Sequence, residues 1–159
     1  MEGWAGNGDV SYTFQSPMQL QLGAAWFYAS GDKGGSEGFW VPLYPDNLGD
    51  RIGRINYASM LNTVGAPTPG TNISVPKVYA SFKPSEKSTV ALAWFPATTV
   101  AETSGDDEIG WGIESGITYQ YTEDVSLGFC VDYFHAGDAI DPIGAEDAWQ
   151  AIGTVSVAF

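Results

Sequence analysis

An alternation of apolar residues with small or polar ones constrains this chain most, because it recurs in seven segments. A period of two predicts β-strands, in which successive side chains point to opposite faces. The segments are 5–14, 18–29, 74–83, 88–97, 109–121, 125–135 and 147–159. In 125–135 the apolar series begins Val125, Leu127 and Phe129. We therefore expect an all-β, antiparallel fold in a single unit that spans 1–159.

Composition excludes several classes of function. Six Lys and Arg stand against 19 Asp and Glu, and the formal net charge of −13 disfavours binding to nucleic acid. The chain has one cysteine, Cys130, and one histidine, His135, which excludes an intrachain disulfide and a site with several histidine ligands. No apolar run approaches the roughly 18 residues of a membrane-spanning helix, and residues 1–4 do not resemble a signal peptide.

Two all-β arrangements fit the alternation, and the period alone does not separate them. In a soluble sandwich or ligand-binding barrel the apolar face points inward, whereas in an outer-membrane barrel it faces lipid. Three details favour the membrane barrel. The segments have about the 9 to 11 residues of a tilted transmembrane strand, aromatic residues gather near strand ends as in an interfacial girdle, and single charges such as Glu114 and Asp132 fall on the other face.

The connections give an independent signal because short and long ones alternate. Residues 15–17, 84–87 and 122–124 are short, while 30–73, 97–108 and 136–147 are long and acidic. Outer-membrane barrels have short periplasmic turns and long extracellular loops. If the last strand runs toward a periplasmic C-terminus, all three short turns are periplasmic and 30–73 is one extracellular excursion. We expect Arg51 and Arg54 of that loop to contribute to a pore constriction.

Seven strands leave two edges, and an open edge is not stable in lipid. The segment is therefore expected to be the C-terminal part of a larger barrel, completed by upstream strands from further sequence or from a partner chain. Its other expected partners are outer-membrane lipid, lipopolysaccharide and the barrel-assembly machinery, for which the terminal aromatic Phe159 resembles the usual signal. Localisation in a bacterial outer membrane follows from the same hypothesis.

The alternation assigns side chains to two environments. The predicted lipid-facing residues are Leu20, Leu22, Trp26, Trp94, Trp111, Ile113, Ile117, Leu127, Phe129, Val155 and Val157. The predicted pore-lining residues are Gln19, Gln21, Lys77, Tyr79, Glu114, Thr118, Gln120, Asp132, Gln150 and Thr154.

Carboxylates are the remaining candidates for chemistry. Those of the long loops are Asp106, Asp107, Glu108, Asp138, Asp141, Glu146 and Asp147. Carboxylate oxygens suit Ca²⁺, although acidic loops more often stay hydrated. The Glu114–Asp132 pair has the same two interpretations, an ion site or solvated lumenal charges. His135 is expected to be interfacial, and we find no nucleophile motif, so the sequence predicts neither an enzyme nor a cofactor.

Particular runs resemble the C-terminal portion of the alginate-export family of outer-membrane porins. They are Tyr28–Lys33 (YASGDK), Phe39–Asn47 (FWVPLYPDN), Trp4–Ala5, Tyr12–Phe14, Lys83–Ser85 and the end of the chain. The resemblance implies an eighteen-stranded monomeric barrel that acts as a passive conduit, with export of a polysaccharide as the family activity. A pore for polyuronates is expected to be lined with Arg and Lys. This chain offers mainly Lys77 against Glu114 and Asp132, which favours cations or neutral solutes.

The leading hypothesis is thus a porin-like channel for small hydrophilic solutes or ions. The alternative is a small closed outer-membrane barrel with a structural or adhesive role and no conduction, which requires an even number of strands. A soluble sandwich or ligand-binding barrel is a third hypothesis, and it predicts a protein that dissolves without detergent.

Overall fold

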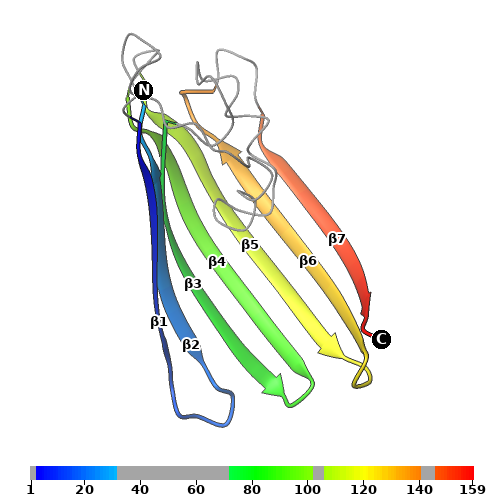
Figure 1. Cartoon of the computed structure of the whole chain (residues 1–159). Coiled ribbons are helices and arrows are strands. Elements are labelled where there is room, and N and C mark those ends of the chain that lie inside the picture. The colour runs from blue at the N-terminus through cyan, green and yellow to red at the C-terminus, as the bar shows by residue number, and fades with distance from the viewer. Residues whose placement is uncertain (1–2, 32–71, 102–105, 141–145) are drawn as a thin grey trace.

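The computed structural model describes residues 3–31, 72–101, 106–140 and 146–159. These residues form one antiparallel sheet of seven strands, each hydrogen-bonded to its neighbours in sequence (Figure 1). The strands are β1 (Ala5–Thr13), β2 (Gln21–Ala29), β3 (Ile73–Ser85), β4 (Ser88–Thr99), β5 (Glu108–Gln120), β6 (Val125–Ala136) and β7 (Ala148–Val157). The described residues contain no helix, and so none that could cross a membrane. The predicted all-β class and the seven antiparallel strands are confirmed.

Strand boundaries differ from the prediction by a few residues, most clearly before β2. The strand was expected from residue 18, but it begins at Gln21. Gln19 has a φ of 47°, in the left-handed region, and its N–H donates to the Ser16 carbonyl. Gln19 is therefore part of the hairpin connection. Glu108, expected in a loop, is the first residue of β5.

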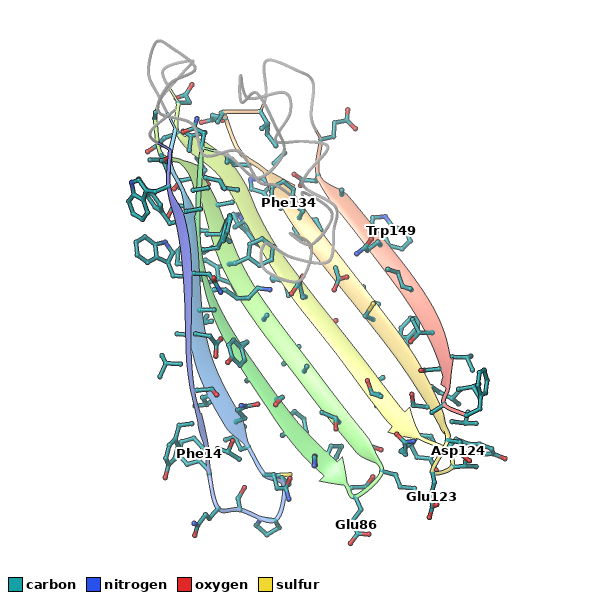
Figure 2. All side chains as sticks on the ribbon, viewed as in Figure 1. Phe14, Glu86, Glu123, Asp124, Phe134 and Trp149 are labelled. Atoms are coloured by element: carbon teal, nitrogen blue, oxygen red, sulfur yellow. The ribbon has the colours of Figure 1, made fainter. Side chains whose placement is uncertain are left out.

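The strand ends that are joined by short connections and those that are joined by long ones lie at opposite ends of the sheet (Figure 1). The short ones join β1 to β2, β3 to β4 and β5 to β6 through residues 14–20, 86–87 and 121–124. The β3–β4 turn carries the acidic side chain of Glu86, and the β5–β6 turn carries those of Glu123 and Asp124 (Figure 2). The asymmetry follows from alternate hairpins, because in an antiparallel meander every second connection returns to the same end.

We call the face that carries Trp94 and Ile113 the outer face, and the face that carries Lys77 and Glu114 the inner face. Direct pairs such as Val78 with Trp94 and Trp94 with Ile113 keep the outer face apolar across the sheet. All seven strands contribute large exposed hydrophobic residues to it, among them Val10, Leu22, Trp26, Val78, Leu92, Ile117, Phe129, Val131 and Val155.

Aromatic residues lie near both ends of the outer face. Toward the long connections, Trp4 stacks on Tyr28 with ring centroids 4.5 Å apart, and the ring centroids of Trp111 and Tyr133 are 5.7 Å apart. Toward the short connections, Tyr12 meets Phe14 edge to face at 4.9 Å. The positions follow from the sequence period, since each aromatic falls on the apolar register of its strand.

Long inner-face side chains lie flat across glycines of the neighbouring strand. Gly23 pairs directly with Tyr79, and Gly112 with Phe95. A Cβ placed on Gly23 would overlap the Tyr79 ring, and one on Gly112 would lie 2.5 Å from Phe95 Cζ. Absence of a Cβ therefore lets the rings rest on the sheet instead of standing away from it.

The inner face is apolar and buried at the end with the long connections. Phe27, Phe95 and Phe134 are at most 3% exposed there, and Phe134 is labelled in Figure 2. Residues after β6 turn onto this layer, because the N–H of Gly137 donates to the Ile109 carbonyl and Ile140 joins the buried cluster. The sequence analysis did not predict this layer.

Candidate functional site

Nine of the ten predicted pore-lining residues lie on β2, β3, β5, β6 and β7 with side chains on the inner face. The register shows this through direct pairs such as Glu114 with Asp132 and Asp132 with Gln150. The nine are Gln21, Lys77, Tyr79, Glu114, Thr118, Gln120, Asp132, Gln150 and Thr154. The exception is Gln19, whose place in the hairpin connection removes it from the strand.

An ion pair spans the middle of this face. Lys77 Nζ on β3 donates to Glu114 Oε2 on β5 at 3.0 Å, and the two side chains are 14% and 10% exposed. The ammonium also lies 5.4 Å from the centroid of the Phe95 ring on β4. Alanine at position 93 leaves the space between β3 and β5 that the lysine crosses. Lys77, the predicted lumenal cation, therefore forms an ion pair with Glu114, one of the predicted lumenal acids.

A second polar group adjoins the pair. Asp132 is directly opposite Glu114 in the β5–β6 register, and the Gln150 side-chain amide donates to its Oδ2 at 2.9 Å. Both carboxylates are buried, Glu114 at 8% and Asp132 at 1% exposure. Burial costs an ionised carboxylate free energy unless donors surround it, and Lys77 and Gln150 supply such donors.

A third polar group lies over β1 and β2. Tyr79 Oη donates to the Asp9 carboxylate, with both carboxylate oxygens at 2.9 Å. The ring crosses β2 above Gly23 to reach it. Beside it, Gln21 links the hydroxyls of Ser11 and Ser81 through its amide nitrogen and oxygen. The hydrogen bonds to Asp9 and the close approach to Gly23 fix the orientation of the Tyr79 ring.

Two predicted pore residues near the short connections, Gln120 and Thr154, lie against the backbone of the turn or of the neighbouring strand. The Gln120 amide donates to the carbonyls of Thr122, Glu123 and Val125 and so stabilises the 121–124 turn. Thr154 lies over Gly128, with which it is directly paired.

The acidic connections do not gather into a cation site in the part of the chain that the structure describes. There, no group of three or more His, Cys, Asp or Glu residues is arranged to hold a metal ion. Asp106, Asp107, Glu108, Asp138 and Glu146 are exposed. Asp141 and the predicted constriction residues Arg51 and Arg54 lie outside the described residues, as does most of 30–73.

Asp147, just before β7, fastens the β6–β7 connection to β6. Its carboxylate accepts from the Tyr133 hydroxyl, from the Ala136 N–H at 3.0 Å and from His135 Nδ1 at 2.9 Å. The Tyr133 hydrogen bond, followed by those from Ala136 and His135, lowers the pKa of Asp147 from 3.8 to about 2. His135 also packs on Trp111, with centroids 5.5 Å apart, which places it among aromatics at the sheet end.

Sequence reasoning identified the inner-face residues but missed how they combine. The partners Lys77 with Glu114 and Tyr79 with Asp9 are separated by 37 and 70 positions in the chain. The signal that could have found the second pair is the glycine at position 23, whose missing side chain allows the tyrosine to cross a strand. The contribution of Ile140 to the buried layer carried no periodic signal.

No protein-family model matches the chain, and the search of curated proteins finds no relative.

Proposed function

We propose that this chain forms part of an outer-membrane β-barrel, and that its inner face lines a porin-like conduit for small hydrophilic solutes or ions. The observation that carries the proposal is the continuous apolar outer face, with Trp26 52%, Trp94 45% and Phe129 53% exposed. Soluble monomers rarely expose so extended an apolar surface. A lipid environment would cover it without any partner protein.

Polar groups on the outer face are satisfied locally, which supports a lipid environment. Ser115 Oγ donates to the Val131 carbonyl at 2.7 Å, and Trp26 Nε1 donates to Ser74 Oγ at 3.0 Å. A polar group that faces hydrocarbon has no water to bond, so it must find a partner within the protein.

The spacing of the aromatic ends also fits a membrane. Trp4 and Tyr12 are eight positions apart, as are Trp111 and Tyr119. At about 3.3 Å per residue this is roughly 26 Å along the strand. Strands tilted by about 40° would project this to roughly 20 Å, close to the apolar band of about 25 Å in outer-membrane barrels.

Conduction is supported by the inner face. Its larger side chains lie flat on glycines, and its charges pair across strands rather than project away from the sheet. This arrangement leaves space along the sheet for hydrated solutes. The family resemblance points to the same role.

The test is to isolate the chain from native membranes and compare boiled and unboiled samples by electrophoresis, followed by planar-bilayer recording. A heat-modifiable species well above 17.0 kDa that conducts is the expected result. A folded, detergent-dependent monomer of 17.0 kDa without conductance would support the small closed barrel instead. A protein that dissolves without detergent would refute the membrane assignment.

A further inference from the structure

Among the residues that the structure describes, two inner-face contacts combine an aromatic ring with a carboxylate, and one of the two contains a lysine ammonium. Phe95 and Glu114 share the Lys77 ammonium, which is 3.0 Å from the carboxylate and 5.4 Å from the ring centroid. Tyr79 and Asp9 form the other combination. Among the described residues, no lysine, arginine or histidine forms an ion pair with Asp9.

The Tyr79 ring is held in a position where the side that faces away from Gly23 can serve as a stacking surface. One side of the ring rests above Gly23, and the hydroxyl is tied to both oxygens of Asp9. A ring held in this way loses little conformational entropy when a ligand stacks on it. The carboxylate at the edge of the ring still has lone pairs available for a second donor.

A hollow of about 390 Å³ adjoins this platform. Its lining includes Asp9 and Tyr79 on one side, Lys77 and Glu114 on the other, and the small residues Ala25 and Ala93 between them. The volume lies within the range of about 300 to 1,000 Å³ found for small-molecule sites. Because Lys77 and Glu114 neutralise one another, the remaining formal charge of the lining is that of Asp9.

We infer that this hollow binds a small organic cation, whose charged group lies over the Tyr79 ring and beside the Asp9 carboxylate. A positive charge over an aromatic face is attracted by the ring quadrupole, and an adjacent carboxylate adds Coulombic attraction. The molecule already uses this chemistry at Lys77, Phe95 and Glu114. The inference deepens the proposed function, on which it rests for the route by which a cation reaches the inner face.

The test measures binding directly in the complete assembly that contains this chain, isolated from native membranes in detergent, by saturation-transfer NMR with choline as the probe. The matched ligand is 3,3-dimethylbutan-1-ol, which has the shape of choline without its charge. Choline is expected to bind and the neutral isostere to bind at least about threefold more weakly. Tyr79→Leu and Asp9→Asn should each raise the choline Kd by about three- to thirtyfold.

Matched controls are Tyr121→Leu and Asp124→Asn, both exposed at the short-connection end. These two variants should leave the choline Kd unchanged. Tyr79→Phe retains the ring and should keep most of the affinity, and each variant is first checked for heat-modifiable folding.

Equal binding of choline and its isostere would overturn the inference, as would choline binding that Tyr79→Leu and Asp9→Asn leave intact. Failure of the proposed function gives a different result, because choline would still bind to a chain that does not conduct. A conducting chain that fails to bind choline refutes the site alone.

Discussion

At the scale of single residues, Lys77 sets the charge balance of the inner face. Its ammonium is bonded to Glu114, whereas the donor that reaches Asp132 from Gln150 is a neutral amide. Sequence reasoning treated Glu114 and Asp132 as equivalent pore acids, and the structure separates them. Charges that line a narrow conduit determine which ions pass.

If the chain forms the proposed channel, replacement of Lys77 by methionine is expected to increase its cation preference, because it removes the positive member of the pair. The double change Glu114→Gln with Asp132→Asn should reduce that preference. Reversal potentials in planar bilayers under a salt gradient measure both effects, with Lys87→Met on the exposed β3–β4 turn as the control. Unchanged reversal potentials would refute an inner-face pore.

Lys77→Met should also lower the free energy of unfolding by about 3 kcal/mol, since it leaves a buried carboxylate without its lysine. Urea unfolding in detergent, followed by tryptophan fluorescence, measures this difference against Lys87→Met. A loss no greater than that of the control would show that water or other donors replace the lysine.

A second residue-scale feature is Gly110, at the irregularity where β4 and β5 change register. It has a φ of +140°, and a Cβ there would overlap the carbonyl oxygen of His135. This overlap cannot be relieved by rotation of a side chain, because the His135 carbonyl belongs to the backbone.

Gly110→Ala is thus expected to destabilise the sheet by about 2 to 4 kcal/mol through strain and overlap. Gly153→Ala is the matched control, because an added Cβ at Gly153 meets nothing within 4 Å. The midpoint of urea unfolding compares the two variants. Equal midpoints would contradict the strained geometry at Gly110.

At the scale of elements, Asp147 holds the β6–β7 connection against the end of β6. Its pKa of about 2 lies below the ordinary 3.8, so the folded state favours the ionised form. A depressed folded pKa contributes stability that is fully present above pH 3.8 and is lost as the pH falls through about 2.

The difference in unfolding free energy between the native chain and Asp147→Asn should therefore be constant above about pH 4 and shrink toward pH 2. Carboxyl NMR of the folded chain is expected to give a titration midpoint near 2 for Asp147. A midpoint at the ordinary 3.8 would show that the hydrogen bonds from Tyr133 and His135 do not form in solution.

At the scale of the whole molecule, the two edge strands run in the same direction. β1 and β7 both start at the end of the sheet where the long connections begin and end (Figure 1). The reason is that consecutive strands alternate in direction, so the first and the seventh strand run the same way. Direct closure of β7 on β1, or a ring of identical copies, would require a parallel seam. In the proposed barrel, antiparallel closure requires an odd number of additional strands, and the eighteen strands implied by the resemblance satisfy this condition.

Cysteine cross-linking tests that closure. In a Cys130→Ser background, Val10→Cys on β1 with Val155→Cys on β7 is expected not to cross-link with a reagent of about 10 Å, since the additional strands of the proposed barrel would separate the two edges. Val10→Cys with Ala24→Cys is the positive control, because these residues are directly paired. Efficient cross-linking of the β1 and β7 pair would show that the sheet closes on itself.

The sequence by itself determined the strands, their antiparallel order and the face on which most side chains lie. The period of two predicts the strands because it is a local property of the sequence. The short connections predict the order, because they join consecutive strands as antiparallel neighbours. The prediction from the alternation is wrong at Gln19, where the backbone is left-handed and the residue lies outside the strand.

Only the tertiary structure decided which inner-face residues meet. Lys77 reaches Glu114 across β4, Tyr79 reaches Asp9 across β2, and Ile140 turns onto the inner face. These contacts depend on exact register and on missing side chains such as that of Gly23, which bring together residues far apart in the chain. Alternation predicts the face of the sheet on which a side chain lies, but it does not predict which side chain two strands away will contact it. The candidate cation site depends on such contacts.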